Sequence, residues 1–158
     1  MPTKSVVKLS HYLRDHDLSI AFAESATTGR LIYEFTSVPD CGKTVRGSIV
    51  CYDPSVKESL LGVPKKVLED CTPESAEVTR YLAESLKKLI PADIIVAVTG
   101  LASPGGSETP EKPVGTMFVE GFIHDEPFGR RMYFEGEPDD IIKQTIEQVA
   151  VLLLEKIA

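Results

Sequence analysis

The amino-terminal part of the chain changes from a helical to an extended pattern of apolar residues. Helical spacing predicts an amphipathic helix over residues 4–16, whose apolar face carries Val6, Leu9 and Leu13. Residues 18–23 then form an apolar run of strand length, which stops at the polar string 24–29. Because helical spacing resumes after residue 29, the polar string is predicted to be a strand-to-helix turn, a place where open α/β sheets often carry function.

The middle of the chain contains two further strand-like runs and two helix-start signals. Asp53-Pro54 and Thr72-Pro73 each place an N-cap residue before a proline, a combination that favours the first turn of a helix. The unbroken apolar run 94–98 is typical of a central strand that is buried on both faces. The patterns predict a strand over 45–52, a helix over 54–61 that ends at Gly62, a helix of about 17 residues up to Pro91, and a strand over 94–98.

The remaining residues predict a long loop, a hairpin and a last helix. Residues 99–113 hold three glycines and three prolines, so neither a helix nor a strand can persist there. Strands are predicted over 114–123 and 130–134, joined across 124–129, and Pro138 opens the last helix. This order of helices and strands predicts an α/β layer fold with a mixed sheet.

Length and charge limit the classes of function. With 158 residues, of which 42% are hydrophobic, the chain can build one core as a single domain over 1–158. Its 17 basic and 24 acidic side chains give a net charge of −7, which repels a polyanion over most of the surface. Nucleic acid is therefore not expected as a partner, whereas a few backbone N–H groups or one lysine can still bind a small anion.

The cysteines and histidines predict a reducing compartment and no metal site. Cys41, Cys51 and Cys71 are odd in number and lack motif spacing, and no apolar leader precedes the first helix, so we expect a cytoplasmic protein. The three histidines do not combine with the cysteines into a zinc-binding pattern. No stretch approaches the ~18 apolar residues that a membrane span needs, so no membrane partner is expected.

The segment around Asp53 brings two candidate groups together. If Asp53 is the N-cap of the helix over 54–61, Tyr52 and Lys57 occupy the two positions that pack against each other in a hydrophobic staple. Lys57 also lies just inside a helix N-terminus, where the helix dipole and partial burial both lower the pKa of an amine. A lysine that is neutral at neutral pH can act as a general base, and a serine beside it is an activated nucleophile.

Ser25 is the natural candidate for that serine, because it lies in the turn 24–29 rather than on a helix face. Simpler interpretations stay open. Ser25 can cap the following helix, Lys57 can be a solvated partner of Asp53, and the ring of Tyr52 can belong to the core. The loop 99–113 lacks the ending of a P-loop; it can present N–H groups to a phosphate or carbonyl oxygen, or carry no ligand.

Five short motifs occur in a characteristic order. They are Ala23-Glu24-Ser25-Ala26-Thr27-Thr28-Gly29, Val45-Arg46-Gly47 leading to Tyr52 and Lys57, Leu61-Gly62-Val63, Val96-Ala97-Val98-Thr99-Gly100, and Pro110-Glu111-Lys112-Pro113-Val114-Gly115-Thr116. Together they resemble the CinA carboxy-terminal family over nearly the entire chain. The last motif and the Ala-Glu-Ser turn are the most specific of the five.

The resemblance implies a fold, an activity and a set of roles. The implied fold is a three-layer α/β/α domain with a mixed, mostly parallel five-stranded sheet, in the stand-alone form of the family. The implied activity is nicotinamide-nucleotide amidohydrolase: nicotinamide mononucleotide (NMN) and water give nicotinate mononucleotide and ammonia in pyridine-nucleotide salvage, without a metal or organic cofactor. By the same resemblance Ser25 is the nucleophile, Lys57 the general base and Tyr52 a residue that assists the pair.

Three polar segments, 24–29, 52–57 and 99–116, follow predicted strands, and we expect them to bind NMN. Backbone N–H groups, Arg46 or Lys112 are the candidates for binding its phosphate. The expected substrate-binding residues are Glu24, Thr27, Thr28, Gly29, Arg46, Thr99, Gly100, Ala102, Gly105 and Lys112. A homo-oligomer is expected as well.

The chain departs from the family's usual pattern near the expected site. Ala26 and Thr28 replace a cysteine and a glycine of the turn, Ser103 replaces a glycine of the later loop, and Asp53-Pro54 replaces Ser-Asn. A β-branched threonine takes a positive φ only at a cost, so the pocket, and with it substrate preference or rate, is expected to differ. The alternative hypothesis is a non-catalytic nucleotide-binding or regulatory module of the same fold.

Overall fold

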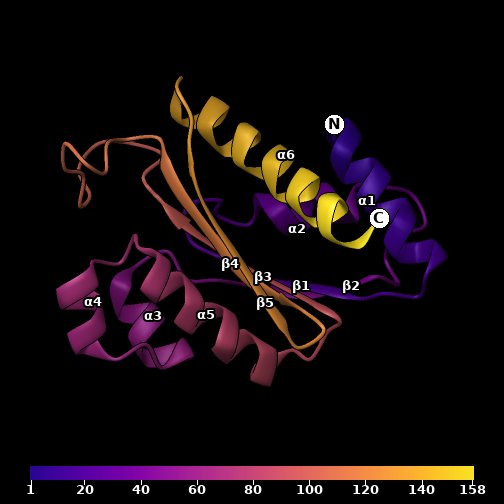
Figure 1. The fold of residues 1–158 in the computed structure, drawn as a ribbon, viewed down its shortest axis with the longest axis horizontal. Coiled ribbons are helices and arrows are strands. Elements are labelled where there is room, and N and C mark those ends of the chain that lie inside the picture. Colours follow the sequence, from indigo (N-terminus) through magenta and orange to yellow (C-terminus); the bar gives the residue numbers. More distant parts are fainter.

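The computed structural model describes residues 1–158, with one five-stranded sheet between two layers of helices (Figure 1). The strands lie in the order β2-β1-β3-β4-β5. The elements along the chain are α1 (Lys4–Asp15), β1 (Ile20–Glu24), α2 (Arg30–Thr36), β2 (Val45–Val50), α3 (Pro54–Leu61), α4 (Lys65–Cys71), α5 (Ala76–Leu89), β3 (Ile94–Gly100), β4 (Thr116–Ile123), β5 (Glu126–Tyr133) and α6 (Pro138–Ile157).

The sheet is mixed, as predicted. β1 pairs in parallel with β2 and with β3, whereas β4 is antiparallel to both β3 and β5. Four of the five strands therefore run in one direction and only β4 runs against them. β3 is the central strand and is buried from Ile94 to Thr99, which confirms the prediction from its unbroken apolar run.

Alternation along the strands distributes side chains to two cores. In β1, Ile20 and Phe22 belong to the core under α1, α2 and α6, while Ala21 and Ala23 face the core under α3, α4 and α5. Figure 1 shows these two helix layers on opposite faces of the sheet. The three-layer α/β/α fold is thus confirmed, and both faces of the sheet are covered.

The helix-start signals are correct at one place and misplaced at the other. Asp53 caps α3 by accepting a hydrogen bond from the Ser55 N–H at 2.8 Å, and α3 ends at Gly62, whose φ is 68°. α5 is instead capped by Ser75, which accepts from the Val78 N–H at 3.2 Å, so Thr72 is not the cap. The chain between them forms α4, a helix of 7 residues that buries only Leu68 and has too short an apolar pattern to be predicted.

The hairpin turn is tighter than predicted. β5 begins at Glu126 rather than at residue 130, and only His124 and Asp125 separate it from β4. The proline and glycine within 126–129 obscured this part of the strand. Pro127 is tolerated because β5 is an edge strand, whose outward-facing backbone groups need no partner in the sheet.

Three whole-chain features bear on binding partners. No helix combines the length and the apolar character needed to cross a lipid bilayer. No three or more His, Cys, Asp or Glu side chains are grouped so that they could hold a metal ion. All three cysteines are free thiols.

Gly121 of β4 occupies a place where no side chain fits. A Cβ added there would overlap the Ile95 carbonyl oxygen and lie 2.7 Å from the ring of Phe128. We expect Gly121→Ala to lower the free energy of unfolding by about 1–3 kcal/mol, as measured by urea denaturation followed by circular dichroism. Gly42→Ala is the matched control, since nothing lies within 4 Å of its added Cβ. Equal losses in the two variants would contradict the packing of β4.

Candidate active site

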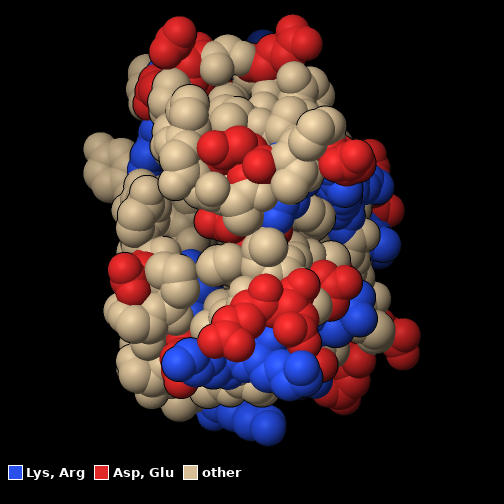
Figure 2. Space-filling model, turned by 90° about the vertical axis from the view of Figure 1, so that its left-hand side faces the viewer, with Lys and Arg blue, Asp and Glu red and all other residues tan.

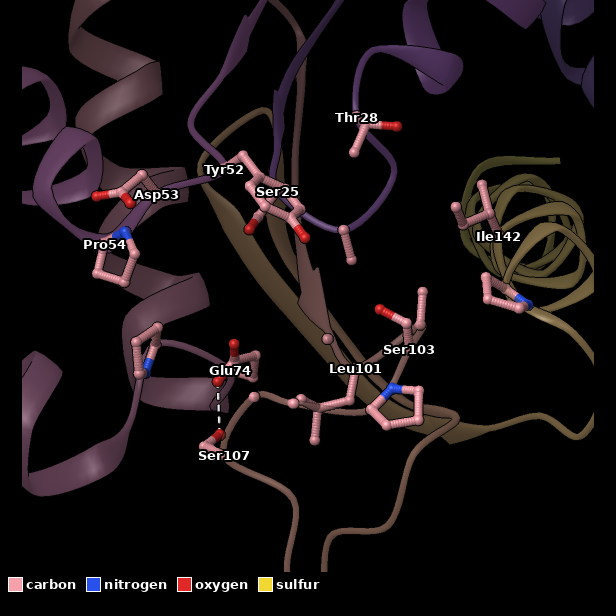
Figure 3. Close-up of a pocket in the computed structure, with 18 residues that line it drawn as sticks. Ser25, Thr28, Tyr52, Asp53, Pro54, Glu74, Leu101, Ser103, Ser107 and Ile142 are labelled. Atoms are coloured by element: carbon pink, nitrogen blue, oxygen red, sulfur yellow. Dashed lines mark hydrogen bonds between the residues drawn. The ribbon is translucent and has the colours of Figure 1, made fainter.

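A cleft of about 490 Å³ opens at the edge of the sheet where β1, β2 and β3 end (Figure 3). Carboxyl ends of parallel strands meet at one edge, so segments far apart in sequence converge there. The cleft is lined by Ser25, Ala26, Thr28, Tyr52, Asp53, Pro54, Pro73, Glu74, residues 100–107, Pro138 and Ile142. The polar segments 24–29, 52–57 and 99–116, which the sequence indicated as candidates, all contribute residues to this lining.

Ser25 is held at the first position beyond β1. Its backbone N–H donates to the Val98 carbonyl oxygen at 3.1 Å, which continues the pairing with β3, and the residue is 6% exposed. The N-cap of α2 is Gly29, with no side-chain capping hydrogen bond. The interpretation of Ser25 as a helix cap is therefore wrong, and its hydroxyl is available for another partner.

Lys57 is buried, with only 1% of its surface exposed. Its Nζ lies 2.9 Å from Ser25 Oγ, 2.8 Å from the Cys51 carbonyl oxygen and 2.9 Å from the Tyr52 carbonyl oxygen. An ammonium group donates to all three oxygens. A neutral amine donates to the two carbonyls and accepts from the Ser25 hydroxyl through its lone pair. A proton can therefore pass between Ser25 and Lys57 without loss of a hydrogen bond.

Burial lowers the pKa of Lys57 below the ordinary lysine value, because the ammonium form loses hydration. Cys51 and the carboxylates of Glu74 and Asp53 act in the opposite direction, with smaller effect. Asp53 makes no ion pair with Lys57; its carboxylate instead caps α3. The interpretation of Lys57 as a solvated partner of Asp53 is thus wrong.

Tyr52 and Lys57 are neighbours, but not through a packed staple. The contact is made by the backbone carbonyl of Tyr52, whereas the residue as a whole is 66% exposed. Tyr52 and Ser25 both line the cleft (Figure 3). The interpretation of Tyr52 as a core residue is therefore wrong, and its ring is accessible from the cleft.

Glu24 shapes the turn that presents Ser25. It is fully buried, and its carboxylate connects β1, β2 and the start of α2. Its oxygens accept hydrogen bonds from Ile32 N at 2.8 Å, Ser48 Oγ at 3.1 Å, Leu31 N at 3.2 Å and Thr27 Oγ1 at 3.1 Å. Glu24 lies outside the cleft lining, so its position is that of an anchor rather than of a substrate ligand.

The other expected substrate-binding residues divide into two groups. Those that line the cleft are Thr28, Gly100, Ala102 and Gly105. Those outside it, besides Glu24, are Thr27, Gly29, Arg46, Thr99 and Lys112. Thr27 and Thr99 are fully buried, and the hydroxyl oxygens of Thr99 and Thr79 share a hydrogen bond of 2.8 Å. Arg46 lies near the start of β2, where its charge acts on Asp93, so it is at the other end of the parallel strands.

Lys112 is occupied by protein acceptors. Its Nζ donates to Thr72 Oγ1 at 2.6 Å, to the Glu74 carbonyl oxygen at 2.8 Å and to Ser107 Oγ at 2.9 Å. These bonds join the loop after β3 to the turn before α5. The three N–H donors of the Lys112 ammonium group are already used within the protein, so its position is structural. It does not support the expected contact with the phosphate.

Thr28 lines the cleft in a conformation that glycine adopts more easily. Its φ is 51°, in the left-handed region, and its side chain is exposed. A β-branched residue there is strained. The turn thus has a backbone conformation at Thr28 that is typical of glycine, and the threonine lines the cleft.

Four lining residues had no sequence signal for a site. They are Pro73, Glu74, Pro138 and Ile142. The first two were interpreted as part of a helix start, and the last two open α6. They reach the cleft only through the packing of α5 and α6 on opposite faces of the sheet, which local patterns do not encode.

The buried carboxylate of Glu24 generates a prediction for stability. In Glu24→Gln an amide group replaces one acceptor oxygen and faces N–H or O–H donors, so at least one buried donor loses its partner. We expect a loss of about 2–3 kcal/mol in the free energy of unfolding. Glu58→Gln, on the exposed side of α3, is the control and should stay close to wild type. A stability of Glu24→Gln equal to that of the control would refute the anchoring role.

The fold and the cleft define an α/β/α protein with a buried serine–lysine pair at the carboxyl edge of its sheet. The chain matches the family model of the CinA C-terminal domain over residues 3–157. It belongs to this family, which confirms the resemblance of the motifs.

The comparisons with individual proteins agree. A CinA-like protein of Thermotoga sp. (strain RQ2) is 39% identical over 125 residues, which are 79% of this chain and 30% of the relative. A CinA-like protein of Petrotoga mobilis is 35% identical over 139 residues, 87% of this chain and 34% of the relative. The chain spans about a third of the length of these curated relatives. The crystal structure of a competence or damage-inducible protein from Enterobacter asburiae has a TM-score of 0.90 and 26% identity, covering 99% of this chain and 100% of that one.

Proposed function

We propose that the chain hydrolyses the carboxamide of NMN to nicotinate mononucleotide and ammonia. The observation that carries the proposal is the 2.9 Å hydrogen bond between Ser25 Oγ and the buried Lys57 Nζ at the cleft. A serine beside a lysine of lowered pKa suits nucleophilic attack on an amide. The substrate is taken from the resemblance of the motifs around these residues to the family.

The reaction proceeds through an ester of Ser25. Lys57 takes the hydroxyl proton while Ser25 Oγ attacks the carboxamide carbon, and Lys57 then gives that proton to the nitrogen as the C–N bond breaks and ammonia leaves. Water next loses a proton to Lys57 and attacks the ester carbon. The Ser25–carbon bond breaks, Ser25 Oγ regains a proton from Lys57, and nicotinate mononucleotide leaves.

The backbone N–H of Ala26 is the proposed donor to the developing oxyanion. Ala26 directly follows Ser25 and lines the cleft, and its N–H donates to no other backbone group. Donors of this kind beside the nucleophile stabilise a tetrahedral intermediate. Tyr52 lines the same cleft as Ser25, and by the resemblance to the family its hydroxyl assists proton transfer to the leaving nitrogen.

Substitution of the pair tests the proposal. We expect Ser25→Ala and Lys57→Met each to lower the rate of ammonia release from NMN by at least about 10²-fold, since each removes a reacting group. Lys66→Met removes a lysine whose side chain is 84% exposed and should retain wild-type turnover. NMN binding without ammonia release by the wild-type chain would instead favour the non-catalytic module.

The pH profile provides a second test. The neutral amine of Lys57 is the active form, so kcat/KM should fall as the pH drops through the pKa of Lys57 in the folded protein, by about tenfold per pH unit. Because burial lowers this pKa, activity should persist to lower pH than an ordinary lysine base allows. A profile that is flat from mild acid to mild alkali would exclude Lys57 as the base.

A further inference from the structure

The residues that line the cleft carry negative but no positive side chains. Asp53 and Glu74 are among them, whereas no lysine or arginine is. Lys57 is buried behind Ser25, and Lys112 is outside the lining. Figure 2 views the molecule from the side of the loop after β3, and on this face the blue basic side chains are interspersed with red acidic ones. A ligand with a positive centre is therefore favoured inside the cleft over a neutral ligand of the same shape.

Glu74 is the acidic side chain with an unused oxygen. The carboxylate of Asp53 is engaged by the N–H and hydroxyl of Ser55 as the cap of α3. Glu74 Oε2 accepts a hydrogen bond from Ser107 Oγ, and no protein group donates to Oε1. Figure 3 shows the second carboxylate oxygen of Glu74 on the side of Ser25 and Tyr52, away from its bond to Ser107.

The position of Glu74 is held from two directions. Ser107 fixes the carboxylate, and Lys112 donates to the backbone carbonyl of Glu74 and to Ser107 Oγ. The positive charge of Lys112 offsets part of the negative charge of Glu74, but its donors are directed at Thr72, Glu74 and Ser107. The carboxylate is thus ordered before a ligand arrives, and binding costs little further side-chain entropy.

We infer that Glu74 is a specificity-determining residue, which recognises the positive charge of an N-substituted pyridinium ring. This inference rests on the proposed function. The carboxamide is attached directly to the ring, so when its carbon meets Ser25 Oγ the ring occupies the cleft between Ser25 and the wall that carries Glu74. The ring of NMN is cationic, and the attraction of a fixed carboxylate for it is not diminished by solvent as strongly in a cleft as at an open surface.

Equilibrium binding to the Ser25→Ala protein tests the role of Glu74 without turnover. The two ligands are NMN and its reduced dihydropyridine form, which has the same phosphate and ribose but a neutral ring. Adding Glu74→Gln should weaken the affinity for NMN on the order of fivefold to tenfold and leave that for the reduced form unchanged. Glu74→Asp keeps the charge and should retain most of the preference for NMN. Glu77→Gln, an equal change of charge three residues away at an exposed position, is the control.

The outcomes separate this inference from the proposed function. Equal weakening of both ligands, no weakening of either, or no binding of NMN to the Ser25→Ala protein would overturn the role of Glu74. If the wild-type chain releases no ammonia but Glu74→Gln still removes the preference for the cationic ring, the proposed function fails and the recognition by Glu74 stands. If ammonia is released and the preference does not depend on Glu74, only the inference fails.

Discussion

The candidate site depends on an amine that is buried among neutral oxygens. Lys57 has no carboxylate within ion-pair distance, and its three hydrogen-bond partners are a hydroxyl and two backbone carbonyls. Such partners compensate an ammonium less completely than a carboxylate would, so burial keeps its lowering effect on the pKa. Because two of the acceptors, Cys51 O and Tyr52 O, belong to the turn that starts α3, the same turn that positions the lysine also orients its lone pair toward Ser25.

The rest of the fold brings Ser25 to this amine. Parallel pairing of β1 with β2 and β3 places three strand ends at one edge, and Ser25 extends the β1–β3 pairing by one hydrogen bond. The buried Glu24 carboxylate ties that turn to α2 and β2, which limits the directions that the Ser25 side chain can take. Thr28 adopts a left-handed conformation in the same turn. This strained residue is three positions after the proposed nucleophile, and the surrounding structure holds its backbone in place.

Features set within a few residues could be predicted from the sequence, and features set by distant packing could not. The cap at Asp53, the end of α3 at Gly62 and the apolar run of β3 are local, and they led to the layer fold and to Ser25 and Lys57 as candidates. The bond between Lys112 and the Glu74 carbonyl joins residues 38 apart in sequence, and no periodicity encodes the loop path that makes it. The resemblance named Tyr52 as a site residue, but its exposure could not be predicted, because that exposure depends on the cleft rather than on the turn between β2 and α3.

The most direct test of the account is an NMR titration of the side-chain Nζ and Cε resonances of Lys57. We expect Lys57 to titrate at a lower pH than an ordinary lysine side chain, and Ser25→Ala to shift the Lys57 titration. Titration of Lys57 at the ordinary lysine value, unaffected by the loss of the Ser25 hydroxyl, would contradict the central claim that burial poises this amine to exchange a proton with Ser25.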